Sequence, residues 1–549
     1  MFKRRISKEL SKLMAGLFSR LTEKNLRVLI FLAVLGFIVY ANSFVVPFFW
    51  DDNDNVVNNV YIKSWAYLPK YFSENLIAGA GLASNYWRPL LLVDYSLDYH
   101  FFGLNKYWWH FVNISLHILN AFLLYLVLDF LFKKKWFAFL IAAIFLVNPL
   151  QTDAVTMITA RADPLFLFFV LLSILFYLKS KKFLSIIFFL SALLTKELAV
   201  ILLPLLLLIE VCFRTSGKFS LKRLALKLLP YFFLAGVYVL GRLTVLNFNN
   251  TLNFYNDGSL YATSLFVRLL TFSKVLLVYF GLLFYPHNLH PERYIEPVTA
   301  VNFSVISAIL LIAAMFFWAV LKYKNNKNYL FGASWFLIAL LPTSNIFIPI
   351  NRPIYEHWLY VPLVGFFIFL ITLLEELWFL LKNKINFFRK FNFFLVSVIS
   401  ILYLIFLSVL TVNRNSIWRD PITFFSDVLK YNRNSLMIWN NLGMAYADTN
   451  NLDSAETAYL EAVKLDQKKA SAPPHHNLGN LYRDRGQFEK AVLEYENAIV
   501  IDKFFYFSYD ALIRLEMKQN KQNEAEEVFK KARGVFLDFP DIFGLSKNL

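Results

Sequence analysis

The sequence has little charge and almost no cysteine. Asp, Glu, Lys and Arg make up 17% of its 549 residues, whereas soluble domains carry roughly 25%. Because Cys212 is the single cysteine, an intrachain disulfide is excluded. Cysteine content therefore does not indicate whether the protein faces an oxidising or a reducing compartment. The shortage of charge excludes the three or four soluble domains that this length would otherwise suggest.

Apolar side chains take the place of the missing charge. Hydrophobic residues make up 58% of the chain, with 60 Phe and a mean hydropathy of +0.50. The net charge of +17 is unevenly spread, because residues 1–413 carry +18 and residues 414–549 carry −1. An excess confined to the apolar part indicates membrane topology, so we expect no nucleic-acid partner.

The apolar runs predict an all-α membrane bundle. Residues 1–27 form a basic amphipathic segment on the cytoplasmic membrane surface, and Val28–Phe49 is an uncleaved first span in a transmembrane domain over 28–413. The other ten predicted spans are 109–132, 136–150, 164–178, 183–195, 197–213, 229–246, 303–321, 330–343, 358–380 and 391–412.

Basic residues in the connecting loops predict the orientation. Together with the N-terminal segment, these loops hold 26 of the 37 Lys and Arg residues before residue 414, and that side is the cytoplasm. Eleven spans then place the C-terminal domain outside. The apolar segment 262–286 carries Arg268 and Lys274, which favours a helix that lies at the interface or re-enters. Composition suggests a bacterial cytoplasmic membrane; an endoplasmic-reticulum membrane with a lumenal C-terminal domain is the alternative.

The segment 414–549 has a different period. Gly443, Tyr446 and Tyr459 recur 36 residues later as Gly479, Tyr482 and Tyr495, and a third, weaker unit follows. This pattern resembles about three tetratricopeptide repeats, an α-solenoid that commonly binds a peptide or protein on its concave face. We expect the repeats to recruit an acceptor or partner; the alternative is that they only stabilise the outer face.

Carboxylates gather in the outer loops, near span ends. A long tryptophan-containing loop, 50–108, opens with Asp51 and Asp52, and we expect it to cover a site reached from the lipid. Solvated loop carboxylates are the plain alternative for this pair. Helix capping is the alternative for Asp153 and Asp163.

Six motifs in order carry a resemblance. They are Trp50-Asp51-Asp52 after Asn42-x-Phe44, Trp87-Arg88-Pro89-Leu90, Asn148-Pro149 to Val155 with Arg161-Ala162-Asp163, Thr195-Lys196-Glu197, Leu341 to Asn345, and Glu356-His357 to Pro362. In this order they resemble the transmembrane and tetratricopeptide-repeat O-mannosyltransferases and their bacterial relatives in the GT-C glycosyltransferase superfamily. Asp153, Asn148 and His357 stand where that family more often has Glu, His and Arg.

The resemblance implies inverting transfer of a sugar, with mannose as the candidate, from a polyprenyl phosphate on the extracytoplasmic face. It places the first-loop acidic pair at Asp51 and Asp52. An inverting displacement needs a base for the acceptor hydroxyl, and we assign Asp51, with Asp52 orienting the acceptor or holding a cation.

The departing phosphate needs cationic hydrogen-bond donors. The candidates for donor-phosphate binding are Arg88, Arg161, Lys196, Arg242, Arg352 and His357. The acceptor-side or supporting candidates are Asp153, Asp163, Glu197, Glu356 and Tyr360. No complete metal-site spacing is present, so no cofactor is required; Asp163 is the candidate ligand of a divalent cation. The alternatives are a membrane-anchored repeat scaffold, a lipid-glycan polymerase or ligase, and a transporter.

Overall fold

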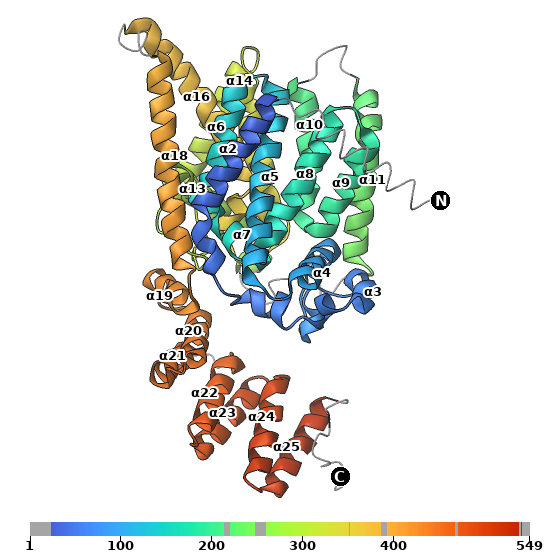
Figure 1. The fold of residues 1–549 in the computed structure, drawn as a ribbon, viewed down its shortest axis with the longest axis vertical. Coiled ribbons are helices and arrows are strands. Elements are labelled where there is room, and N and C mark those ends of the chain that lie inside the picture. Colours follow the sequence, from blue (N-terminus) through green and yellow to red (C-terminus); the bar gives the residue numbers. More distant parts are fainter. Residues whose placement is uncertain are drawn as a thin grey trace. The chain divides into compact units, whose positions relative to one another are not determined.

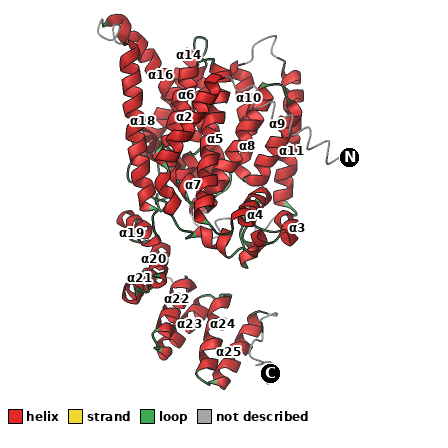
Figure 2. Ribbon diagram, in the orientation of Figure 1, coloured by secondary structure: helices red, strands yellow, loops and turns green. Residues whose placement is uncertain are grey.

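The computed structural model describes residues 23–213, 220–246, 260–350, 352–385, 392–466, 470–536 and 540. The chain divides into two units, residues 1–419 and 420–549 (Figure 1). Every regular element of the described residues is helical (Figure 2), which confirms the all-α prediction. Nearly all of the predicted amphipathic segment 1–27 lies outside the described residues.

Unit 1 is a bundle of apolar helices. Its larger helices are α2 (Glu23–Val39), α4 (Pro89–Phe102), α5 (Lys106–Phe132), α6 (Lys135–Val147), α8 (Ala162–Leu178), α9 (Lys182–Thr195), α10 (Leu202–Phe213), α11 (Leu221–Leu243), α13 (Leu265–Phe284), α14 (Phe303–Lys322), α15 (Asn328–Leu340), α16 (Pro362–Lys384) and α18 (Asn392–Ile417). Short elements join them, among them η2 (Asn53–Val57), α3 (Leu68–Ser73), α7 (Thr152–Thr156), η7 (Thr159–Arg161), η8 (Glu197–Ile201), α12 (Leu260–Thr263) and η10 (Glu356–Leu359).

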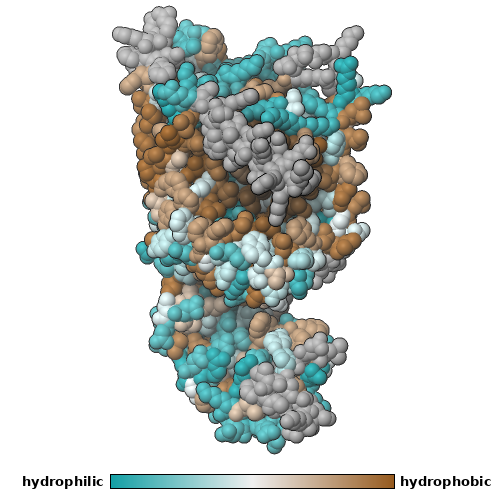
Figure 3. All heavy atoms as spheres, turned by 45° about the vertical axis from the view of Figure 1, so that its right-hand side comes forward, coloured by the Kyte–Doolittle hydropathy of each residue, from teal (hydrophilic) through white to brown (hydrophobic). Residues whose placement is uncertain are grey.

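Seven described helices are long and apolar enough to cross a membrane, or eight if the bent pair α6 and α7 counts as one. Figure 3 shows a broad apolar band on the surface of unit 1. The prediction was eleven spans. It left out α13, which is one of the seven. It also counted α2, α9, α10 and α15, which have 17, 14, 12 and 13 residues in the structure. A bilayer core needs about 20 residues of helix, and hydropathy alone does not show where an apolar run stops being helical.

The segment predicted to re-enter contains α13, which is itself long enough to span. The residues after it, however, return to its beginning. Val298 N donates to Thr271 Oγ1 at 2.9 Å, and Leu270, Val298 and Val305 pack together. The N-terminal halves of α13 and α14 therefore lie side by side, which favours re-entry over a crossing.

The lysine-bearing ends of several helices meet each other. Lys134 Nζ lies 3.2 Å from Glu375 Oε2, and Lys322 pairs with Glu376 on the same turn of α16. Lys227, in a third predicted cytoplasmic loop, pairs with Glu210. These pairs support the prediction that the basic loops share one side of the membrane.

Unit 2 contains paired antiparallel helices. They are α19 (Pro421–Tyr431), α20 (Leu436–Asp448), α21 (Leu452–Leu465), α22 (Ala472–Asp484), α23 (Phe488–Ile501), α24 (Tyr506–Lys518) and α25 (Gln522–Val535). A Cβ added to Gly443 would stand 2.5 Å from the Tyr459 ring, and one on Gly479 would stand 2.6 Å from Tyr495. The recurrent Gly and Tyr are thus a tight interhelical contact, as the repeat pattern predicts.

Candidate active site

Three interactions between segments distant in sequence assemble one group of polar side chains in unit 1. Asp52 Oδ1 accepts from Thr159 N at 2.9 Å, Arg88 pairs with Glu197, and Lys196 pairs with Asp163. They join the first long loop to the turns before α8 and after α9. Five of these six residues were predicted site residues, and folding brings them together.

Local sequence explains the break between α6 and α7, which brings the chain toward the same group of side chains. A proline at position 149 stops α6 at Val147, and the chain turns by 55° into α7. Asn148 Oδ1 accepts from Leu150 N at 3.1 Å and so satisfies the turn. The break places Asp153 at the site instead of inside a continuous helix.

Asp52 is the buried member of the acidic pair. Its side chain also accepts from Phe49 N at 3.4 Å, and 2% of the residue is exposed. Burial raises the pKa of Asp52 to about 7, although the hydrogen bonds from Thr159 and Phe49 favour the carboxylate. A carboxyl group in this state exchanges a proton near neutral pH.

Asp51 is accessible, but the surrounding protein removes much of the water around its carboxyl group. Desolvation and the charge of Asp54 together raise the pKa of Asp51 to about 6. Asp51 is therefore mostly ionised at pH 7 and still basic enough to accept a proton. These properties suit the general base that the sequence predicted.

Two ion pairs share a neighbour with the acidic pair, because the charges of Arg88, Glu197 and Asp51 all act on Tyr86. Arg88 Nε and Nη2 donate to the two oxygens of Glu197 at 3.2 and 2.7 Å. The next residue in the chain, Lys196, holds Asp163 at 2.6 Å, and both side chains are buried. Since Lys196 and Glu197 are consecutive, two cations and two carboxylates stand together.

His357 belongs to the same electrostatic neighbourhood. Burial lowers its pKa, although the charges of Asp163 and Asp153 act in the opposite direction. The imidazole is therefore neutral at pH 7 and can donate one hydrogen bond without adding charge.

A second acidic pair, Asp153 and Glu356, lies behind His357. Glu356 is buried and accepts from Arg293 Nη2 at 2.7 Å and from His290 N at 3.0 Å. Asp153 Oδ1 accepts a hydrogen bond from Arg414 Nη2 at 3.3 Å. Burial and the charge of Asp153 raise the pKa of Glu356, so Glu356 keeps its proton to a higher pH than an exposed glutamate does.

Two predicted residues face the protein interior. Arg161 is fully buried; it pairs with Asp94 at 2.8 Å and with Asp98, and it donates to Trp109 O at 3.0 Å. Tyr360 Oη bonds to His117 Nδ1 at 2.8 Å inside the bundle. Arg161 therefore braces the long loop, and Tyr360 braces α5.

Two other predicted cations lie at the edge of the group. Arg242 donates to the carbonyls of Asn85 and Leu246, which anchors the end of α11 to the long loop. Arg352 pairs with Glu292 at 2.6 Å and stands over the ring of Tyr355. Both Asp51 and Tyr86 raise the pKa of Tyr355, so Arg352 lies near the acidic pair.

Sequence reasoning missed Arg414, Glu292 and Tyr86. Arg414 is in the last turn of α18, whereas the prediction began the second domain at that residue. A charge at the end of an apolar run was the available signal. The other two lie in loops where single polar residues show no pattern.

The predicted divalent cation has no assembled site in the described ranges. No three His, Cys, Asp or Glu side chains converge there as metal ligands would, and Asp163 contacts Lys196. The cation stays a prediction.

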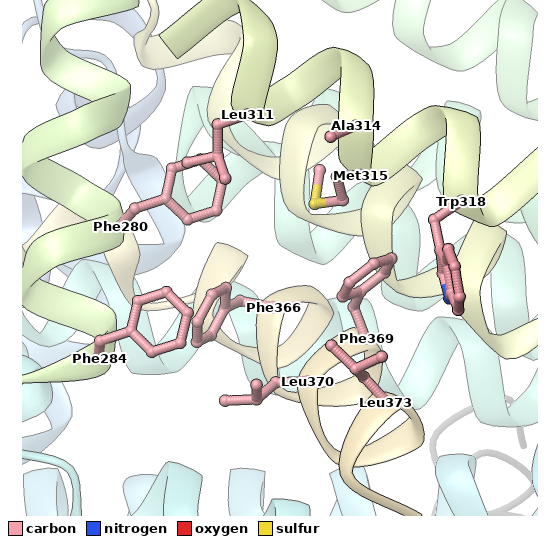
Figure 4. A pocket seen from close by; sticks show the side chains of 10 residues that line it. All are labelled: Phe280, Phe284, Leu311, Ala314, Met315, Trp318, Phe366, Phe369, Leu370 and Leu373. Atoms are coloured by element: carbon pink, nitrogen blue, oxygen red, sulfur yellow. The ribbon is translucent and has the colours of Figure 1, made fainter. Parts of the chain in front are cut away.

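An apolar cavity of about 350 Å³ lies between α13, α14 and α16 (Figure 4). Phe280, Phe284 and Phe366 point into it. Tyr279, the residue before Phe280, donates a hydrogen bond to Tyr355 O at 2.9 Å. One helix therefore touches both the cavity and the loop of Glu356.

The helical bundle, the paired charges and the repeats define a polytopic membrane protein with a tetratricopeptide-repeat unit. The tetratricopeptide-repeat family matches residues 438–469 and 472–504. A protein O-mannosyl-transferase of Caenorhabditis elegans is 25% identical over 459 residues, which covers 81% of this chain and 63% of the relative. Protein O-mannosyl-transferase TMTC3 of Mus musculus and of Homo sapiens are each 24% identical over 565 positions, 92% of this chain and 60% of theirs.

The chain is thus a homologue of the TMTC protein O-mannosyl-transferases, which confirms the resemblance in the motifs. The chain spans about three fifths of the length of these relatives.

Proposed function

We propose that this chain is an integral membrane protein O-mannosyltransferase. It moves mannose from a polyprenyl phosphate to a hydroxyl group of a protein, on the extracytoplasmic face and with inversion at the anomeric carbon. The observation that carries the proposal is the group formed by Asp51, Asp52, Arg88, Lys196 and His357 in a chain homologous to protein O-mannosyl-transferases. A scaffold would need no such buried charge.

Asp51 is the general base. It takes the proton of the acceptor hydroxyl as that oxygen bonds to the anomeric carbon, while the bond from this carbon to the phosphate oxygen breaks. Asp52 is fixed by Thr159 N and Phe49 N. It therefore has the rigidity needed to orient the acceptor beside Asp51.

The leaving phosphate lies against Arg88, Lys196 and His357. Each cation is held by one carboxylate, Glu197 or Asp163, which fixes its position before the donor arrives. Donors placed in advance stabilise the charge that grows on the phosphate without reorganisation cost. Arg352 and Arg242 are outer candidates for the same role.

The apolar cavity beside α13 accommodates the first isoprenoid units of the donor. Its lining side chains are all apolar (Figure 4), and Tyr279 connects its wall to the loop that carries Glu356 and His357. A lipid chain there would leave its phosphate group directed toward the charged group. The repeats recruit the acceptor protein, and the membrane is the bacterial cytoplasmic membrane.

The test is mannosyl transfer by the purified chain from a synthetic polyprenyl-phosphate mannose to an acceptor protein. We expect Asp51→Asn to lower kcat by roughly 10²- to 10⁴-fold, the usual contribution of a general base. Asp52→Asn should lower it less. The matched control is Glu296→Gln, an exposed carboxylate in the loop after α13, which should keep full activity.

Two results would contradict the proposal. Wild-type protein that transfers no sugar from any polyprenyl phosphate would remove the transferase assignment. Full activity in Asp51→Asn, with transfer by the wild type, would remove only the base assignment.

A further inference from the structure

Unit 2 has an open cavity of about 480 Å³ between α19, α20 and α21. Trp439, Leu442 and Tyr446 on α20 contribute the apolar part of its lining, with Leu429 of α19. These are repeat positions that ordinarily face a neighbouring helix. The cavity therefore exposes surface that a complete repeat junction would cover.

The second repeat closes the equivalent space with its own side chains. There Lys490 stands over the Tyr482 ring at 5.1 Å, and Glu494 Oε2 pairs with His475 Nδ1 at 2.6 Å. The residues 36 positions earlier are Ser454 and Ala458, which are too short to reach across. The cavity exists because two long side chains of one repeat are short in the other.

The mouth of the cavity is cationic. Lys430 and Arg433 line it, both exposed, and none of the lining residues is acidic. Lys430 has Asp427 at 3.0 Å on its own helix, while the Arg433 guanidinium has no carboxylate partner among the described residues.

We propose that this cavity binds an acidic segment of a partner protein. An apolar or aromatic side chain of the segment fills the space over Tyr446 and Trp439, where Lys490 and Glu494 stand in the second repeat. Glutamate or aspartate residues beside it meet Lys430 and Arg433. This site lies between three helices at the start of the array, and it is separate from the charged group in unit 1.

The test uses the full chain in detergent micelles and fluorescence anisotropy. The probe is a short fluorescein-labelled peptide in which Glu residues flank a Phe. Matched peptides carry Gln for Glu or Ala for Phe. We expect wild-type protein to bind the probe more tightly than either matched peptide, and the Glu-dependent part to weaken with salt.

Two variants separate charge from shape. Arg433→Glu combined with Lys430→Glu should weaken binding by about tenfold or more, whereas Lys503→Glu, a single charge reversal at another exposed position, should leave it unchanged. Ser454→Lys adds a cation but fills the cavity as Lys490 does, so it should also weaken binding. Thermal unfolding midpoints near that of wild type show that the variants are folded.

The proposal is overturned if wild type does not prefer the acidic probe, or if the charge reversals leave binding unchanged. It is also overturned if Ser454→Lys strengthens binding, because a diffuse charge effect would then suffice. The assay measures binding alone, so its outcome is independent of whether the chain transfers mannose.

Discussion

At the residue scale, neighbouring carboxyl groups of the first loop have different environments. Asp52 is buried and fixed by two backbone donors, while Asp51 is accessible and mostly ionised at pH 7. Consecutive residues can differ in this way because both lie in a helical turn that continues into η2, where neighbouring side chains point about 100° apart. The difference supports separate roles, with Asp51 accepting the proton and Asp52 orienting the acceptor.

The pKa values predict the pH dependence of transfer. A base must be ionised, so kcat/KM should rise with pH through about 6 and level off once Asp51 has lost its proton. The charge of Asp54 raises the pKa of Asp51. Asp54→Asn should therefore move this rise to lower pH.

Rate profiles of the wild type, Asp54→Asn and Glu296→Gln from pH 5 to 8 measure the effect. Glu296→Gln should keep the wild-type profile. A profile that does not change in Asp54→Asn, or that moves to higher pH, would contradict Asp51 as the titrating base.

At the element scale, α15 and α16 approach each other closely enough to need glycine. A Cβ on Gly365 would stand 2.4 Å from Phe336 N and 2.6 Å from Gly332 O, both rigid backbone atoms. Gly365→Ala should therefore push the helices apart and lower the free energy of unfolding by roughly 1–3 kcal/mol. Thermal unfolding in detergent micelles measures the change.

Gly281→Ala in α13 is the matched control. A Cβ there meets nothing within 4 Å, and Ala favours a helix over Gly by about 0.5–1 kcal/mol. This variant should unfold at the same temperature as wild type or slightly higher. Equal losses in the two variants would contradict the close contact between α15 and α16.

Elements were predictable from sequence where the signal was local. The first two repeats have the same Gly and Tyr positions 36 residues apart. In the structure these Gly and Tyr residues contact each other, as the repeat pattern predicts. The bundle was predictable as a class, but not its helix ends. The site was predictable only as a set of loop residues. The Lys196–Asp163 and Arg88–Glu197 pairs depend on how helices pack, and nothing in the local sequence shows that Arg161 turns inward.

At the scale of the whole molecule, the sign of charge on each loop predicts which side of the membrane it faces. The lysine-rich helix ends pair with Glu375 and Glu376. The segment after α13 returns to the start of that helix. If both inferences hold, Glu296 lies outside the membrane and Lys324 inside.

Cysteine labelling in intact cells tests this orientation. The native Cys212 is buried, so wild-type protein should react little with a membrane-impermeant maleimide. Glu296→Cys should be labelled from outside, and Lys324→Cys only after the membrane is permeabilised; both positions are exposed. Lys503→Cys in the repeats should react as Glu296→Cys does.

Labelling of Lys324→Cys in intact cells would reverse the orientation. If Glu296→Cys is protected while Lys503→Cys is labelled, α13 crosses the membrane. The return segment, with Arg293, would then lie on the side opposite the proposed active site.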